Sequence, residues 1–188
     1  MRPHMKAENV FALSMAFALA TSEAVEKVSK LRPMIKWPND IYLSGKKLGG
    51  MLTEFSVIDN YTEYVIVGLG LNVNWSPGDE ETLLYDSTSV LAESGTHIDR
   101  EHLLARLLTG FEEYYGGILS GRLKAVYKSW NERSLLLNRM VDIQTAEGKI
   151  SGKAIRIDQT GALIIRDAGG KEQRILNGDV SVSGLSER

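Results

Sequence analysis

The chain has 188 residues, enough for one ordinary domain and a small second one, and its 43% hydrophobic content excludes disordered and low-complexity proteins. Its 22 Lys and Arg residues nearly balance 24 Asp and Glu residues, so neither a nucleic-acid partner nor a strongly basic surface is expected. The absence of cysteine excludes disulfides, thiolate zinc sites and a cysteine nucleophile, and it suits a cytoplasmic protein.

The amino-terminal residues resemble a secretory signal peptide, because two basic residues precede an apolar stretch at residues 10–20. Glu8 nevertheless lies in what would be the basic region, and the apolar periodicity continues to Leu31. The apolar stretch is also well short of the ~20 residues that a membrane-spanning helix needs, so no membrane association is expected. We therefore predict an amphipathic core helix, with these residues on one face: Leu13, Phe17, Ala20, Ala24 and Val28.

Short strands are predicted after Pro33, which ends the helical pattern. The last of them contains residues 64–67, an almost wholly apolar run that is typical of a strand covered on both faces. The predicted strands are residues 34–37, 41–43, 47–55 and 63–71.

The middle of the chain is predicted to be a loop followed by helices. The loop covers residues 75–87 and contains the acidic pair Glu80 and Glu81. A short helix over residues 88–94 ends at Gly95, and Asp99 is the expected N-cap of a longer one that the glycine pair at 116–117 weakens. Another helix, over residues 123–132, should bury Val126, Tyr127 and Trp130.

From Arg139 onward the hydrophobic period changes to two, with turn signals at residues 147–148, 160–161, 169–170 and 177–178. About five short strands packed this closely favour a small curled barrel over an open sheet. We place the domain boundary near Leu137, which gives a first domain of residues 1–136 and a second of residues 137–188.

Two segments carry candidate chemistry: KWPND at residues 36–40 with Lys47 behind it, and GLGLNVN at residues 68–74. A lysine on a rigid strand can neutralise a carboxylate or a phosphate oxygen. Asp40 and Asn72 offer the hard oxygens that Mg²⁺ prefers. Gly68 and Gly70 share one strand face, where a ligand could lie flat on the backbone. Together these residues suggest a site for a nucleotide and a metal ion.

Each residue also has a plainer interpretation. Lys47 could be a solvated charge, Asp40 part of a turn, and the two glycines a bulge. The chain contains no GxGxxG dinucleotide fingerprint, no Walker glycine loop and no GxSxG elbow, and its histidines lack metal-site spacing.

The two segments, their spacing and the GDVS sequence at residues 178–181 resemble the biotin protein ligases, also called biotin-[acetyl-CoA-carboxylase] ligases. The resemblance covers essentially the whole chain. It implies an α/β (α+β) catalytic domain, similar to class II aminoacyl-tRNA synthetases and to other biotin synthetase-like and lipoate ligase domains. It also implies a small C-terminal SH3-like β-barrel.

The resemblance further implies activation of biotin by ATP and Mg²⁺ to biotinyl-5′-AMP, followed by transfer to a lysine of a biotin carboxyl carrier protein. Lys47 would be the catalytic lysine, in contact with the biotin carboxylate and the α-phosphate. Asp40 and Asn72 would lie near the metal. The remaining residues implied to surround biotin or the adenylate are Trp37, Leu48, Gly49, Gly68 and Gly70, with Asn72 beside them.

The sequence departs from the family pattern at its amino-terminal end. The arginine- and glycine-rich biotin loop that precedes an Arg-Pro pair in the family has no counterpart before Arg2 and Pro3, and no helix-turn-helix segment is present. One alternative is therefore a catalytically impaired ligase fragment that binds an adenylate or a carrier domain. Another is a stable pseudo-domain whose motifs only form turns. An open sheet edge at the truncated side would favour a homodimer.

Overall fold

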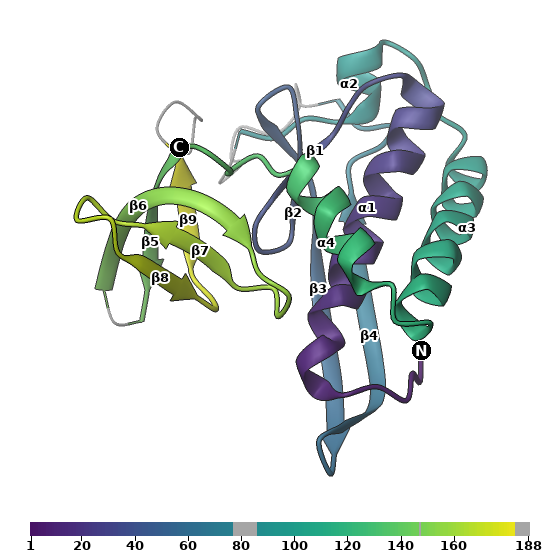
Figure 1. Ribbon diagram of the computed structural model, residues 1–188. Coiled ribbons are helices and arrows are strands. Elements are labelled where there is room, and N and C mark those ends of the chain that lie inside the picture. Colours follow the sequence, from purple (N-terminus) through teal and green to yellow (C-terminus); the bar gives the residue numbers. More distant parts are fainter. Residues whose placement is uncertain (77–85, 147, 183–188) are drawn as a thin grey trace.

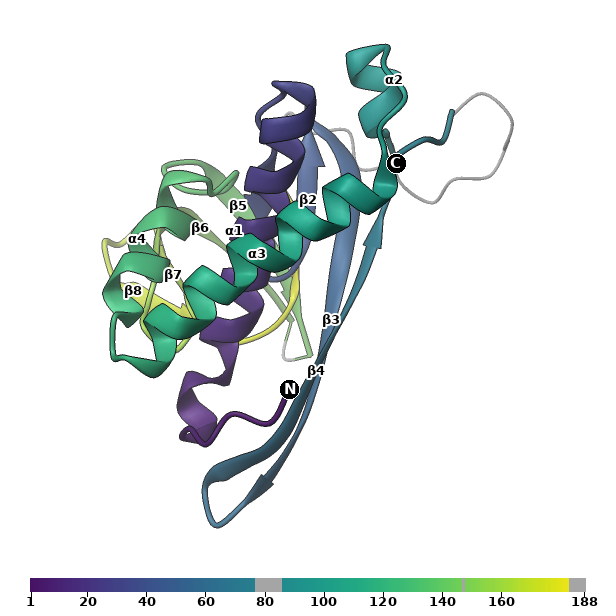
Figure 2. The same cartoon turned by 90° about the vertical axis from the view of Figure 1, so that its right-hand side faces the viewer.

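The computed structural model describes residues 1–76, 86–146 and 148–182 (Figures 1 and 2). Glu80, Glu81 and most of the predicted loop lie outside the described residues, as does Glu147. The first part of the chain contains a mixture of helices and strands: η1 (Ala7–Asn9), α1 (Val10–Ser29), β1 (Met34–Lys36), β2 (Asp40–Leu43), β3 (Lys46–Ile58), β4 (Tyr61–Leu71), α2 (Val90–Ser94), α3 (Arg100–Leu119) and α4 (Leu123–Glu132). The second part contains only strands: β5 (Met140–Thr145), β6 (Gly148–Ile157), β7 (Leu163–Arg166), β8 (Glu172–Ile175) and β9 (Asp179–Val182).

The first sheet is antiparallel throughout, in the order β1-β2-β3-β4. Figures 1 and 2 show α1 and α3 on the same side of the long β3–β4 ribbon. The residues before η1 extend this sheet, since the backbones of Met1 and Val65 bond each other in both directions at 2.9 Å.

The α1 helix is confirmed, but it is buried on more sides than an amphipathic surface helix would be. Ser14, Thr21 and Ser22 are buried together with its apolar residues. The Ser14 and Thr53 hydroxyl oxygens lie 2.7 Å apart, and the Thr21 hydroxyl donates to the Phe17 carbonyl at 2.8 Å. Such hydrogen bonds allow Ser14 and Thr21 to occupy buried positions. Ser22 is the exception, because its buried hydroxyl has no hydrogen-bond partner among the described residues. None of the helices within the described residues is both long and apolar enough to span a membrane.

The prediction that residues 64–67 are covered on both faces is wrong. Val65 is fully buried, whereas its neighbour Ile66 is 53% exposed. Alternate side chains of a strand point to opposite faces, and the helices cover only one face of β4. Among the described residues, no helix covers the other face of the β3–β4 ribbon, where Leu52, Phe55 and Ile66 are exposed.

The three later helices of this part are confirmed. The Ser89 side chain caps α2 by accepting from the Ala92 N–H, and Asp99 caps α3 by accepting from Glu101 and His102. The paired glycines do not end α3, which continues to Leu119. The α4 helix buries the three predicted residues: Val126, Tyr127 and Trp130.

The second sheet has the order β8-β7-β6-β5-β9, and all its pairings are antiparallel. The strands were predicted, but the barrel they were expected to form is not closed. Closure would require the two edge strands to pair. In the part of the chain that the structure describes, β8 and β9 are the unjoined edges of the sheet.

The two parts share one hydrophobic core, which contains residues of α1, β1, α4 and the second sheet. Polar contacts also join them. The Trp37 indole donates to the Gly161 carbonyl at 2.8 Å, and the Asn131 side chain accepts from the Ile157 N–H at 3.0 Å. Tyr127 donates to the Gln159 carbonyl. These contacts fix the second sheet beside β1 and β2.

Candidate active site

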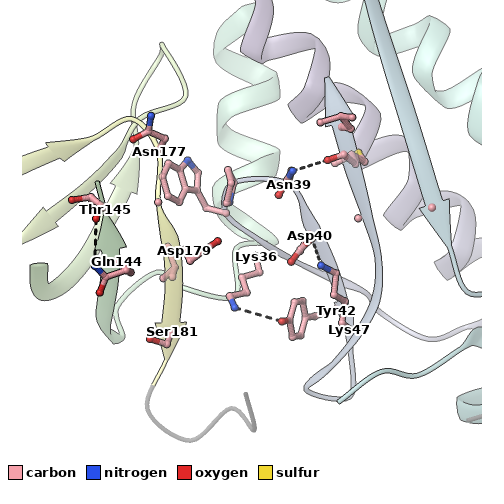
Figure 3. A pocket seen from close by; sticks show the side chains of 18 of the residues that line it. Lys36, Asn39, Asp40, Tyr42, Lys47, Gln144, Thr145, Asn177, Asp179 and Ser181 are labelled. Atoms are coloured by element: carbon pink, nitrogen blue, oxygen red, sulfur yellow. Dashed lines mark hydrogen bonds and ion pairs between the residues drawn. The ribbon is translucent and has the colours of Figure 1, made fainter. Parts of the chain in front are cut away.

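A cleft of about 1150 Å³ lies between the two sheets (Figure 3). One wall and the floor come from β1 to β4 and the turn between β1 and β2. The other wall comes from the second sheet, at the end of β5 and along β9. Most of the residues predicted to carry chemistry lie on the first wall and the floor.

Lys47 and Asp40 form an ion pair within this cleft, with 2.8 Å between Nζ and Oδ1. They lie on adjacent strands, on either side of a register shift between Ile41 and Tyr42. The backbone of Lys47 is fixed on its other edge as well, because its N–H donates to Asp86 and its carbonyl accepts from Thr88, both at 2.9 Å. Lys47 is therefore held in place both by its backbone hydrogen bonds and by the ion pair of its side chain with Asp40.

Gly50 allows this ion pair to form, a role that the sequence did not reveal. A Cβ atom at this position would lie 2.8 Å from Asp40 Oδ1 and 3.6 Å from Lys47 Cε. Any larger side chain would therefore push the aspartate and the lysine apart. Gly50 also lines the cleft itself.

Gly68 and Gly70 form an open floor, as predicted from their alternation along the strand. Cβ atoms built on them would meet nothing closer than 3.8 Å and 4.0 Å, respectively, so the bare backbone faces the cleft. Gly49 differs, because a Cβ atom there would lie only 2.4 Å from the Gly70 carbonyl oxygen. Gly49 and the fully buried Leu48 are not among the lining residues and support the floor from within the sheet.

Trp37 lines the cleft, yet it is only 1% exposed, and its indole is directed to Gly161. The adjacent Lys36 also lines the cleft and is 8% exposed. Its Nζ lies 3.5 Å from the Tyr42 hydroxyl and 5.4 Å from the centre of that ring. Lys36 and Tyr42 were missed as lining residues, although strand alternation could have placed them on the same face.

The structure places Asn72 beside the cleft and not in it. Its Nδ2 donates to the Thr88 carbonyl at 3.0 Å, while its own carbonyl accepts from Val90 at 3.0 Å. Asn72 thus holds the segment that leads into α2. Of the two predicted metal-binding residues, only Asp40 lines the cleft, and the described residues contain no group of three or more His, Asp or Glu side chains that could hold a metal ion.

The second wall was not predicted as part of the site. It contributes these polar residues to the lining: Gln144, Thr145, Asn177, Asp179 and Ser181. Figure 3 shows the Asp179 side chain directed toward the first wall. Their position depends on how the second sheet packs against the first part of the chain, and the hydrophobic pattern of the sequence does not predict that arrangement.

Two family models match the chain. Residues 1–72 match the Biotin/lipoate A/B protein ligase family, and residues 136–183 match the Biotin protein ligase C terminal domain. The fold is thus that of a biotin/lipoate ligase type of protein.

Curated and solved relatives agree. The chain is 30% identical over 176 residues to the biotin-[acetyl-CoA-carboxylase] ligase of Paracoccus denitrificans, covering 92% of this chain and 73% of that protein. It is 31% identical to the bifunctional ligase/repressor BirA of Bacillus subtilis, over 88% of this chain and 51% of BirA. A crystal structure of the Aquifex aeolicus biotin protein ligase has a TM-score of 0.79 and 30% identity, with 94% of this chain and 76% of that chain covered. The chain belongs to the biotin protein ligase family, and it spans about half the length of the BirA relatives it matches.

Proposed function

We propose that this chain forms the catalytic core of a biotin protein ligase. It would activate biotin with MgATP to biotinyl-5′-AMP and transfer the biotin to a lysine of a biotin carboxyl carrier protein. The observation that carries the proposal is the Lys47–Asp40 pair beside a bare glycine floor in one large cleft. A further Aquifex aeolicus ligase structure, with a TM-score of 0.77 and 29% identity, is described as a complex with biotin and ATP.

Lys47 suits the first step because that step brings two anions together. A carboxylate oxygen of biotin attacks the α-phosphorus of ATP, a C–O–P linkage forms, and pyrophosphate leaves. An ammonium group fixed between the two anions reduces their repulsion and stabilises the charge that develops. Asp40 holds Nζ in place, and no covalent enzyme intermediate is needed.

The residues present fit the Mg²⁺ that ATP carries. Mg²⁺ usually takes one or two carboxylates, with phosphates and water as its other ligands. Asp40 can supply that carboxylate from the cleft wall. Asn72 lies beside the cleft, so we assign it the positioning of the segment before α2.

The floor and its supports would shape the binding site for biotin and the adenylate. Gly68 and Gly70 leave the strand surface open to a flat ligand, and Leu48 and Gly49 keep that surface rigid from within the sheet. Trp37 would pack at the boundary of the site, where it also anchors the second sheet.

Two further features belong to this proposal. The cysteine-free sequence suits the reducing cytoplasm, where we place the reaction.

Within the described residues, no strand pairs with the outer edge of β4 beyond Val65, and such an edge favours self-association. Light scattering at increasing protein concentration tests this homodimer, and a monomer at every concentration would contradict it.

The test of the main proposal is the incubation of the chain with biotin, MgATP and a carrier domain, read as a mass shift of the carrier. Lys47→Ala should lose about 10²–10³-fold in rate. Lys46→Ala is the matched control, because Lys46 is the neighbouring lysine and pairs instead with Asp86, at 3.8 Å. Tight binding of a non-hydrolysable biotinyl-adenylate analogue without any labelling would contradict the proposal.

A further inference from the structure

Asp179 is placed at the cleft by the start of β9, within a sequence motif to which the proposed function assigns no role. It pairs with Gln144 across the β5–β9 ladder, and both residues line the cleft. Alternation along β9 directs Val180 and Val182 into the core, where both are buried. Asp179 and Ser181 are therefore on the face that looks toward the first wall (Figure 3).

Gly178 fixes this position. Its φ of +144° lies in the region that favours glycine, and a Cβ atom there would be 2.8 Å from Ile143 Cγ2 and 2.9 Å from the Gln144 carbonyl. The turn before β9 is consequently held closely against β5. The backbone that carries Asp179 has little freedom to withdraw from the cleft.

The charges around the cleft make Asp179 distinct. Among the described residues that line the cleft, four are charged: Lys36, Asp40, Lys47 and Asp179. Asp40 forms an ion pair with Lys47, and Asp142, the acidic residue of β5, forms one with Lys149 at 2.9 Å. Asp179 is exposed and has no ion-pair partner among the described residues.

A carboxylate in this place is not suited to the first step of the proposed reaction. That step gathers the biotin carboxylate and the phosphates, and a nearby negative charge would repel both. The second step differs, because its incoming group is a lysine side chain that is protonated at neutral pH. A carboxylate across the cleft from Lys47 would attract and orient that cation.

We propose that Asp179 is a positioning residue that receives the ammonium group of the acceptor lysine in the transfer step, an inference that rests on the proposed function. The ammonium first releases a proton to water. The free amine then attacks the acyl carbon of biotinyl-5′-AMP, so that a C–N bond forms and the C–O bond to AMP breaks. AMP leaves, and the nitrogen releases a second proton to water to give the amide.

The test uses preformed biotinyl-5′-AMP and compares two nucleophiles. One is a carrier domain, whose lysine arrives as a cation, and the other is hydroxylamine, which is uncharged at neutral pH. Asp179→Asn should lower kcat/KM for the carrier by about tenfold, mainly through KM, and should affect the hydroxylamine reaction much less. Asp179→Glu should restore most of the loss. Asp142→Asn removes a neighbouring carboxylate that does not line the cleft and serves as the matched control.

The outcomes are distinct. Equal losses with both nucleophiles, or a failure of Asp179→Glu to recover activity, would overturn the role of Asp179. A wild-type chain that makes no adenylate from biotin and MgATP contradicts the proposed function, while transfer from the preformed adenylate still decides the role of Asp179. A wild-type chain that transfers nothing from the preformed adenylate overturns both.

Discussion

The Trp37 indole nitrogen donates to the carbonyl oxygen of Gly161 at 2.8 Å, joining two residues that are 124 positions apart in the sequence. Gly161 has a φ of +85°, and the ring of Phe11 lies directly against it. This contact joins a residue that lines the cleft to the sheet that forms the opposite wall. The width of the cleft therefore depends on how tightly the chain packs at Gly161.

Gly161→Ala should destabilise the protein more than Gly170→Ala. Both glycines have nearly the same positive φ, +85° and +83°, so both substitutions carry the left-handed backbone cost of roughly 1 kcal/mol. Only the Cβ atom at position 161 meets a neighbour, since it would lie 1.9 Å from Phe11 Cδ1, whereas position 170 is open. Overpacking should add about 1–3 kcal/mol, measured by urea unfolding. If both variants lose the same free energy of unfolding, the Phe11 ring moves aside for the added methyl group without an energetic cost.

Gly70→Ala should weaken ligand binding without changing stability, whereas Gly49→Ala should lower stability. The methyl group at position 70 would enter the cleft, with no protein atom closer to it than 4.0 Å. The free energy of unfolding should therefore change by less than ~0.5 kcal/mol. Affinity for biotinyl-5′-AMP should fall about tenfold or more, because the ligand can no longer lie on the strand. Gly49→Ala should instead lower stability. Calorimetric titration and thermal unfolding of the two variants provide the measurements, and an unchanged affinity for Gly70→Ala would contradict the assignment of the floor.

Asp158 should make stability depend on pH in the acid range. Burial alone would raise its pKa, but hydrogen bonds from the side chains of Thr160 and Arg174 and from the backbone of Thr160 and Ala162 lower it to about 2. In the unfolded chain the pKa of an aspartate is about 3.9. The stabilisation is therefore complete above about pH 4 and is lost as the pH falls through about 2. In Asp158→Asn, the free energy of unfolding measured in urea should change less with pH between about pH 2 and pH 4 than it does in the wild type. Glu54→Gln, a change at an exposed position of β3, should leave the dependence as in the wild type.

Asp99→Ala should destabilise α3 at its first turn. The Asp99 carboxylate accepts from the N–H groups of Glu101 at 2.9 Å and His102 at 3.1 Å. Loss of such a cap costs about 0.5–2 kcal/mol. Asp99→Ser should retain most of the stability, because serine is also a strong N-cap residue. A free energy of unfolding that is the same for the alanine variant as for the wild type would argue against the cap.

The helices were the most predictable part of the fold because their signals are local. Capping by Asp99, the stop at Gly95 and the apolar spacing of α4 all lie within a few residues of the elements they define. Along the first wall and the floor, the placement of Lys47, Asp40 and the two floor glycines could also be predicted. These residues are carried by neighbouring strands joined by short turns.

The errors concern features that depend on distant contacts. The exposure of Ile66 follows from the absence of a covering layer over one face of β4, which a run of apolar residues does not reveal. The open edges of the second sheet and the second wall of the cleft follow from how that sheet closes and docks. The position of Asn72 beside the cleft, where its amide donates to the Thr88 carbonyl, is also set by such a contact, and its role near the metal stays a prediction.

The shared core also bears on how the chain is made. The α1 helix is synthesised before all the strands of both sheets, yet Phe11 packs against Gly161, and the core around α1 includes Val182 of β9. Its apolar residues must therefore remain without their final partners until nearly all of the following strands have been synthesised. A nascent chain in this state presents the kind of surface that chaperones bind, so we expect the core around α1 to form only after β9 has been synthesised.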